Sequence, residues 1–188
     1  MRVISGTRKG ITLKAVPGHS TRPTTDKVKE SIFNMVGPYF DGGSILDLYG
    51  GSGAISIEAI SRGMEHAVIV DRDKKAISTI YQNVKIGKVK ELVEVFRTDA
   101  KRALKAIQKN ERSFDLVFLD PPYADEKLHD EISFISEHGI LKEGGQMVVE
   151  HGLGVDLEPQ YGDMKQQKIE QYGDTTIRIY ESVAKEEI

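Results

Sequence analysis

A carboxylate followed by two prolines ends an apolar run in the stretch FDLVFLDPPYADEK. Proline fixes φ and has no backbone N–H, and it disfavours helical geometry in the residue before it. We therefore expect Asp120, Pro121 and Pro122 to be extended and stiff, with carbonyl oxygens that no helix uses. With Tyr123 next in the chain, this stretch would form a rigid set of hydrogen-bond acceptors beside an aromatic ring.

Such a corner suits the chemistry of an amino group on an aromatic base. That amine is a poor nucleophile because its lone pair is delocalised into the ring. The Asp120 carboxylate and the Pro121 carbonyl could each accept a hydrogen bond from one of its two N–H groups. These hydrogen bonds would localise the lone pair on the nitrogen in the transition state. Tyr123 offers a flat face on which the base can stack, and holding the reactants in line adds further acceleration. The same residues can also simply end a strand in a turn, so the corner needs support from elsewhere in the chain.

That support comes from a glycine-rich segment, GGSGAIS, which follows another short apolar run. Glycine has no Cβ, so the backbone of Gly51 and Gly53 can approach a ligand closely. The segment nearly matches the dinucleotide-binding fingerprint, with Ser56 in place of the third glycine. Asp71 follows about 20 residues later, as a ribose-binding acid should. An NAD-dependent oxidoreductase is therefore one interpretation.

Asp47, just before the glycines, favours a different ligand. Its negative charge would repel a pyrophosphate and attract an ammonium or sulfonium group. S-adenosylmethionine carries both positive groups, and its ribose hydroxyls suit Asp71. Asp99 could accept a hydrogen bond from the adenine amino group, although it could equally serve as a plain N-cap of the next helix.

The elements that must position these residues alternate along the chain. Apolar strand patterns are each followed by an amphipathic helix pattern. The expected strands are 44–49, 66–71, 93–96, 114–120 and 146–150, with two more near 166–169 and 176–183, and the expected helices are 24–37, 54–63, 73–87, 100–110 and 126–138. This order predicts an α/β fold with a mostly parallel, seven-stranded sheet that has helices on both faces. Ligands bind at the carboxyl ends of the strands in such folds, which is where the four aspartates fall.

One domain is predicted over residues 1–188, with an N-terminal extension at 1–40 and a catalytic core at 41–183. The extension should contain a small β-hairpin, from 2–6 and 11–15, and a helix that starts near Thr25 and ends at Gly37. In the helix 73–87 we expect four residues to face inward: Ile77, Ile80, Tyr81 and Val84.

Charge is distributed unevenly over the chain. The net charge is −3, yet residues 1–29 contain seven basic side chains and one acidic one, a net +6. A basic arm that includes Arg8, Lys9 and Lys14 can bind phosphates, unless the hairpin is only a solvated surface. The chain has no cysteine and no apolar stretch of membrane-spanning length. Its N-terminus lacks the apolar core of a signal peptide, and these features together favour the cytoplasm. The histidines show no metal spacing, so no metal is expected.

In combination, these motifs resemble a known family. The DPPY corner is typical of class I S-adenosylmethionine-dependent methyltransferases that modify exocyclic amines. RPTTDKVKESIFN, ILDLYGGSGAISIEAISRG, FDLVFLDPPY and YGDTTIRIY are similar to segments of the bacterial 16S rRNA guanine-N2 methyltransferases. The resemblance extends from about Arg2 to Tyr180. It implies methyl transfer to the N2 amine of a guanine in 16S rRNA, either in naked RNA or within an assembling small ribosomal subunit.

The resemblance also implies roles for individual residues. Catalysis would fall to Asp120, Pro121, Pro122 and Tyr123. The cofactor would contact Asp47, Tyr49, Gly50, Gly51, Ser52, Gly53, Asp71, Arg72, Asp99, Ala100, Arg22 and Thr24. RNA would contact Arg8, Lys9, Lys14 and Arg22. The family usually has Phe-Ala where this chain has Tyr49-Gly50, and Glu where it has Asp71, so cofactor affinity is in question.

Three other functions stay open on the sequence alone. A DNA adenine-N6 methyltransferase shares the corner chemistry, but 188 residues leave little room for a separate target-recognition domain. An NAD-dependent oxidoreductase is disfavoured by Asp47 and Ser56. A noncatalytic RNA-binding protein could keep the same fold.

Overall fold

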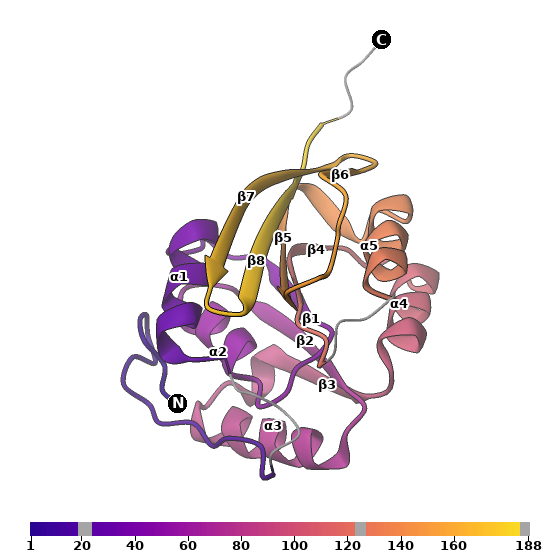
Figure 1. Cartoon of the computed structure of the whole chain (residues 1–188). Coiled ribbons are helices and arrows are strands. Elements are labelled where there is room, and N and C mark those ends of the chain that lie inside the picture. The colour runs from indigo at the N-terminus through magenta and orange to yellow at the C-terminus, as the bar shows by residue number, and fades with distance from the viewer. Residues whose placement is uncertain (19–23, 123–126, 185–188) are drawn as a thin grey trace. The chain divides into compact units, whose positions relative to one another are not determined.

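The structure, a computed structural model, describes residues 1–18, 24–122 and 127–184 (Figure 1). Arg22 and Tyr123, two of the predicted site residues, lie outside the described residues. By their internal contacts, the residues form two compact units, Met1–Asp99 and Ala100–Ile188. No described helix is long and apolar enough to cross a membrane.

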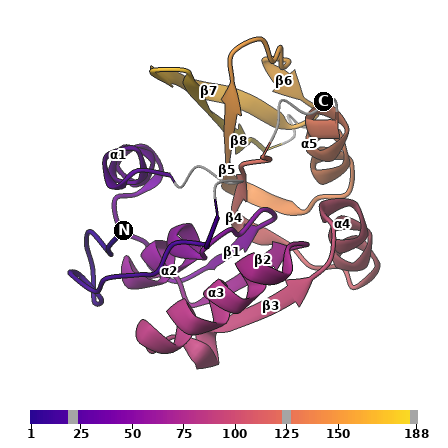
Figure 2. The same ribbon diagram turned by 60° about the horizontal axis from the view of Figure 1, so that its bottom comes forward.

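The first unit is built on three parallel strands in the order β3-β2-β1. They are β1 (Ser44–Asp47), β2 (His66–Asp71) and β3 (Val93–Arg97). The helix α2 (Ala54–Ser61) packs against β1 and β2, and α3 (Lys74–Ile86) packs against β2 and β3 (Figure 2). A short 3-10 helix, η1 (Lys90–Leu92), leads into β3. Because all strands are parallel, the three carboxyl ends lie at one edge of this sheet.

The N-terminal extension differs from its prediction in part. The helix α1 (Asp26–Val36) begins after Thr25, whose side chain accepts a hydrogen bond from the Val28 N–H, as predicted. The predicted hairpin is present but short: Arg2 and Thr12 form an antiparallel bridge, and backbone hydrogen bonds join Val3 to Ile11 and Leu13 to Met1, each at 2.8 Å. The residues that follow Val3 give backbone N–H groups to α2 instead. For example, the backbone N–H of Ile4 donates to the Glu58 carboxylate at 2.9 Å.

The second unit combines two parallel strands with an antiparallel tail, in the order β4-β5-β8-β7-β6. Its elements are α4 (Ala100–Lys109), β4 (Phe114–Leu119), α5 (Lys127–Glu137), β5 (Leu141–Gly152), β6 (Gln160–Tyr161), β7 (Met164–Tyr172) and β8 (Thr175–Ser182). Strands β4 and β5 are parallel, whereas β8 runs antiparallel to β5 and to β7. The helices α4 and α5 pack against each other.

The predicted α/β class is confirmed, with local differences. Eight strands occur among the described residues rather than seven, because the two-residue β6 also pairs. Strand β5 begins at Leu141 rather than at the predicted residue 146, and its register with β4 is irregular near this start. On α3, Ile80 and Val84 are buried as expected, but Tyr81 is 56% exposed and Ile77 is half-buried. The buried face of α3 includes the polar residue Asn83 instead.

Candidate active site

Asp47 is the most unusual side chain of the first unit, because it is a fully buried carboxyl group. It ends β1 with 1% of its surface exposed. The Ser56 hydroxyl donates to its Oδ2 at 3.0 Å, while Oδ1 is buried and has no well-formed hydrogen bond to any described residue. Burial raises the pKa of Asp47 from 3.8 to about 7, and the nearby charge of Asp71 adds to this, against the opposing hydrogen bonds from Ser56 and the Tyr49 backbone. A cation placed at Oδ1 would restore the ionised form.

The loop after β1 is a tight turn with an accessible outer side. Gly50 donates to the Val70 carbonyl at 2.8 Å, and Gly53 donates to the Gly50 carbonyl at 2.8 Å, so the turn is tightly closed. Gly53 has a φ of 81° where α2 begins, a conformation that favours glycine. A Cβ added at Gly51 would meet nothing within 4 Å, so the outer side of the loop is accessible to a ligand.

Asp71 braces this loop from the end of β2. Its Oδ2 accepts from the Gly51 N–H at 2.9 Å, and its Oδ1 accepts from the Asp73 N–H at 2.9 Å. Each carboxylate oxygen has a second lone pair, so these bonds leave acceptor capacity for a ribose hydroxyl. The sequence suggested the ribose role and did not suggest that Asp71 also shapes the loop.

Apart from Thr24, the other predicted cofactor residues of this unit come shortly after the ends of β1, β2 and β3. Asp99 is half-buried and follows Thr98, whose N–H donates to the Asp71 carbonyl at 3.1 Å. Thus Asp47, Asp71 and Asp99 follow or end three adjacent parallel strands. Of the rest, Tyr49, Ser52 and Thr24 are half-buried and Arg72 is exposed; Ala100, the first residue of the second unit, is buried.

Sequence reasoning missed a second brace of the loop, Asn83. This side chain on α3 is fully buried. Its Nδ2 donates to the Ser52 carbonyl at 2.8 Å and to the Lys14 carbonyl at 2.9 Å, while its Oδ1 accepts from the Lys14 N–H at 2.8 Å. Asn83 therefore ties the N-terminal arm to the glycine loop. The signal in the sequence was an amide between the apolar positions Ile80 and Val84 of one helical face.

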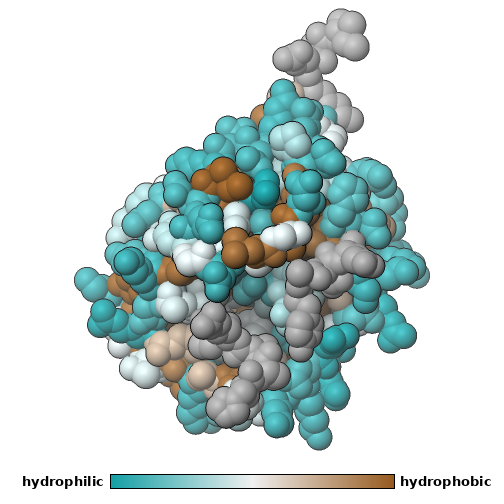
Figure 3. Space-filling view, viewed as in Figure 1, coloured by the Kyte–Doolittle hydropathy of each residue, from teal (hydrophilic) through white to brown (hydrophobic). Residues whose placement is uncertain are grey.

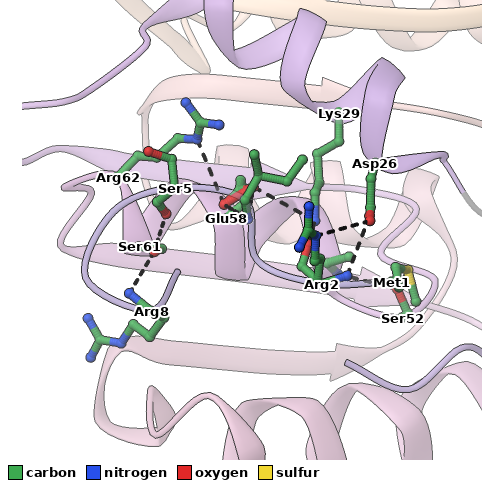
Figure 4. Close-up of polar contacts among 12 residues, drawn as sticks. Met1, Arg2, Ser5, Arg8, Asp26, Lys29, Ser52, Glu58, Ser61 and Arg62 are labelled. Atoms are coloured by element: carbon green, nitrogen blue, oxygen red, sulfur yellow. Dashed lines mark hydrogen bonds and ion pairs between the residues drawn. The ribbon is translucent and has the colours of Figure 1, made fainter. Parts of the chain in front are cut away.

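A buried ionic cluster fixes the start of the chain, and we call Lys29, Glu58 and Arg62 the N-terminal clamp (Figure 4). The Glu58 carboxylate lies 3.8 Å from Lys29 Nζ and 3.8 Å from Arg62 Nε, and all three side chains are almost fully buried. Lys29 Nζ donates to the Arg2 carbonyl at 2.7 Å. Burial lowers the pKa of Lys29, and the Glu58 charge opposes that shift. All eight residues of α2 are buried, and the clamp joins Glu58 of this helix to Lys29 of α1.

The predicted RNA-binding residues of the arm fall into two groups. Arg8 is half-buried and anchored, since its backbone N–H donates to Ser61 Oγ at 2.9 Å and its Nε donates to the Gly87 carbonyl at 3.3 Å. Lys9 and Lys14 are exposed on the surface. The arm therefore presents two cations on a fixed backbone.

The acceptor corner belongs to the second unit. Asp120 is half-buried, Pro121 is buried and Pro122 is exposed, directly after β4. Leu119, the last residue of β4, pairs with Val149 of the parallel strand β5. The corner thus follows the carboxyl end of a strand, as the sequence indicated.

Comparison with known proteins defines the class and then the family. The chain is similar to the solved structure of yhhF from Escherichia coli, with a TM-score of 0.83 and 26% identity over 98% of this chain and 99% of that one. The fold is that of a Rossmann-like class I methyltransferase. YlbH of Bacillus subtilis is 54% identical over 180 residues, 96% of this chain and 98% of that protein. Ribosomal RNA small subunit methyltransferase D of Haemophilus influenzae is 34% identical over 151 residues, 80% and 78% of the two chains.

A family model described as Conserved hypothetical protein 95 matches residues 1–181. The chain belongs to this family, and the resemblance to the small-subunit rRNA methyltransferases that its motifs indicated is confirmed.

Proposed function

We propose that the protein is an S-adenosylmethionine-dependent methyltransferase that modifies the N2 amine of a guanine in 16S rRNA. The observation that carries the proposal is the buried Asp47, which comes just before the glycine loop and whose Oδ1 has no well-formed hydrogen bond among the described residues. A buried carboxylate of this kind is stable only when it is neutral or paired. The ammonium group of S-adenosylmethionine is a suitable partner.

The residues present fit this cofactor. Asp47 would bind the cationic methionine end, Gly51 and Gly53 would allow close backbone approach, and Asp71 would accept from the ribose while it braces the loop. Asp99 would accept a hydrogen bond from the adenine amino group. When bound, the cofactor supplies an electrophilic methyl group on a sulfonium.

The protein's own contribution to the transfer is the acceptor corner. The Asp120 carboxylate and the Pro121 carbonyl would each accept a hydrogen bond from one N–H group of the guanine amine, which favours rehybridisation of the nitrogen. Because proline fixes the backbone, these acceptors need little rearrangement as the transition state forms. The guanine must be unpaired or extruded from its helix to present this amine.

The names of the relatives support RNA rather than DNA as the substrate. The relative from Haemophilus influenzae is named a ribosomal RNA small subunit methyltransferase. Asp47 counts against NAD, because a dinucleotide would bring its pyrophosphate to the same loop and next to a buried carboxyl group.

The direct test is a methylation assay with tritiated S-adenosylmethionine on small-subunit particles and on naked rRNA from cells that lack the protein. We expect label in 16S rRNA, at the N2 position of one guanine. Label in DNA adenine, or tight binding of NAD without binding of S-adenosylmethionine in calorimetry, would refute the proposal.

A variant of the corner tests the role of Asp120. Asp120→Asn keeps the size of the side chain but weakens the acceptor, so turnover should fall by about 10²-fold or more, the scale seen when one preorganised transition-state contact is removed. S-adenosylmethionine affinity should stay within twofold. Turnover like that of the wild type would remove Asp120 from the mechanism.

A further inference from the structure

A pocket of about 320 Å³ lies in the second unit, at the carboxyl end of β5 and beside the β7–β8 hairpin. Six of the residues that line it are His151, Gly152, Leu153, Ile169, Thr176 and Arg178. The register pairs His151 with Thr176 and Arg178 with Ile169, and both pairs lie on one face of the sheet because alternate residues share a face. No acidic side chain lines the pocket among the described residues.

Arg178, the cation of this pocket, is held in a fixed orientation. Its Nε donates to His151 Nε2 at 2.9 Å, and its Nη1 donates to Gln166 Oε1 at 2.8 Å. His151 Nδ1 in turn lies 2.9 Å from the Gly152 carbonyl, which places the proton of the neutral ring on Nδ1. These contacts use one edge of the guanidinium group, while Nη2 carries two further N–H donors.

The arrangement keeps His151 neutral, so that Arg178 is the charged group. Burial lowers the pKa of His151, and the neighbouring Arg178 charge lowers it further, against the hydrogen bond to Gly152. The other groups near Arg178 are Gln166 and Ile169 of β7 and the phenols of Tyr161 and Tyr180. Burial raises the pKa of both phenols, so neither carries a negative charge at neutral pH. A preoriented guanidinium group without an acidic partner in its pocket is suited to bind an anion such as a phosphate.

Apolar surface accompanies this cation. Leu153 is 59% exposed and Ile169 is 49% exposed, although both are large hydrophobic side chains. Figure 3 shows hydrophobic surface on β7 and beside it, within a surface that is otherwise mostly hydrophilic. A fixed cation next to exposed apolar side chains matches a nucleotide, which combines a phosphate with a sugar and a flat base.

The position of the pocket connects it with the acceptor corner. Leu119, just before the corner, pairs with Val149, and Val149 pairs with Arg178, so the three residues form one row across β4, β5 and β8. Neighbouring strands lie about 4.8 Å apart, so the backbone of Arg178 is roughly 10 Å from that of Leu119. This separation is on the scale of one nucleotide of a single strand.

We infer that this pocket binds a nucleotide of the substrate RNA next to the guanine that is modified. Arg178 contacts its phosphate, and Leu153 and Ile169 contact its sugar and base. The inference rests on the proposed function, because it assumes that RNA reaches the acceptor corner. It adds a specificity site outside both the cofactor loop and the corner.

The test uses RNA binding without cofactor, so that it does not depend on methyl transfer. The probe is a fluorescein-labelled, single-stranded 12-nucleotide RNA of mixed sequence, titrated with the full chain at several salt concentrations. Arg178→Gln should weaken binding about tenfold and reduce the salt slope by about 0.7, the value for one lost phosphate contact on a single strand. Lys168→Gln is the matched control, because it removes one positive charge from an exposed position of β7 outside the pocket. It should change the affinity less than twofold.

A second variant keeps the test decisive if Arg178→Gln unfolds. Ile169→Asp places a carboxylate opposite Arg178 at an exposed position, so it should weaken RNA binding at least tenfold with little change in unfolding temperature. The inference is overturned if folded Arg178→Gln or Ile169→Asp binds the probe like the wild type, or if Lys168→Gln weakens binding as much as they do. If these variants lose probe binding but the wild-type protein does not methylate rRNA, the proposed function is refuted and the pocket remains an RNA-binding site.

Discussion

Replacing Asp47 by asparagine should stabilise the protein and weaken cofactor binding at the same time. The side chain is buried with 1% exposure, and its pKa is raised from 3.8 to about 7. Asparagine has nearly the same shape and can still accept the hydrogen bond of Ser56. It has no charge that burial could penalise, and no charge that could attract an ammonium group.

The size and sign of the effect follow from proton linkage. The folded-state pKa lies above the unfolded value, so between about pH 4 and 7 the native state binds more protons than the unfolded chain, and stability falls as the pH rises through this range. For the full shift, the loss approaches about 4 kcal/mol at neutral pH and above, which is an upper bound. Asp47→Asn removes this loss, so its advantage over the wild type should grow from near zero at pH 4 to at least about 1 kcal/mol at pH 8.

Urea unfolding at pH 4, 6 and 8 measures the stability difference, and calorimetry with S-adenosylmethionine at pH 8 measures binding. We expect Asp47→Asn to lose at least about tenfold in cofactor affinity, since one charge-assisted contact is commonly worth about 1.5–3 kcal/mol. For the wild type, binding at pH 6 should release protons to the buffer. A variant that is less stable than the wild type at pH 8, or that binds the cofactor equally well, would contradict this account of Asp47.

Three further predictions concern the first unit. Glu58→Gln breaks the N-terminal clamp and leaves buried cations, so the free energy of unfolding should drop by about 3 kcal/mol in urea titrations, and a drop below 1 kcal/mol would count against the clamp. Gly50→Ala should destabilise by about 1–3 kcal/mol because its Cβ would lie 2.3 Å from Ile69 Cγ2, and adding Ile69→Ala should make the Gly50 change much less costly in a double-mutant cycle. Exchanging Lys9 and Lys14 for glutamine should reduce the salt slope of RNA binding by about 1.4 in total without lowering the unfolding temperature, and an unchanged slope would exclude the arm as a phosphate contact.

The fold class followed from the sequence because strand and helix patterns alternate with clear boundaries. Glycines and threonines marked the ends of the helices, as Thr25 and Gly63 show. The hairpin is shorter than predicted because alternating polarity does not specify how many residues of the two strands pair with each other. Val3 and Leu13 pair across the hairpin, whereas the N–H groups of Ile4, Arg8 and Lys14 donate to Glu58, Ser61 and Asn83.

The candidate site could be predicted where a residue type signals chemistry by itself. Asp47, the glycine loop and the Asp120 corner belong to this group. The bracing roles could not be predicted, because they depend on tertiary packing. In the sequence Asn83 is an ordinary helical residue, because its partners Ser52 and Lys14 are distant in the chain and reach its amide only in the folded structure. The same holds for Arg178, whose orientation depends on His151, 27 positions earlier in the chain.

The anchoring of the first residues has a consequence for the order of folding. The hydrogen bonds and ion pairs described for residues 1–14 reach no further than Asn83 and Gly87, so they all fall within the first compact unit. During synthesis, the emerging chain can therefore close this unit and dock its leading end before the segment with the acceptor corner has left the ribosome. The docking joins positions more than 50 apart in sequence, such as Ile4 and Glu58. It should thus be a late, comparatively slow step in the formation of this half.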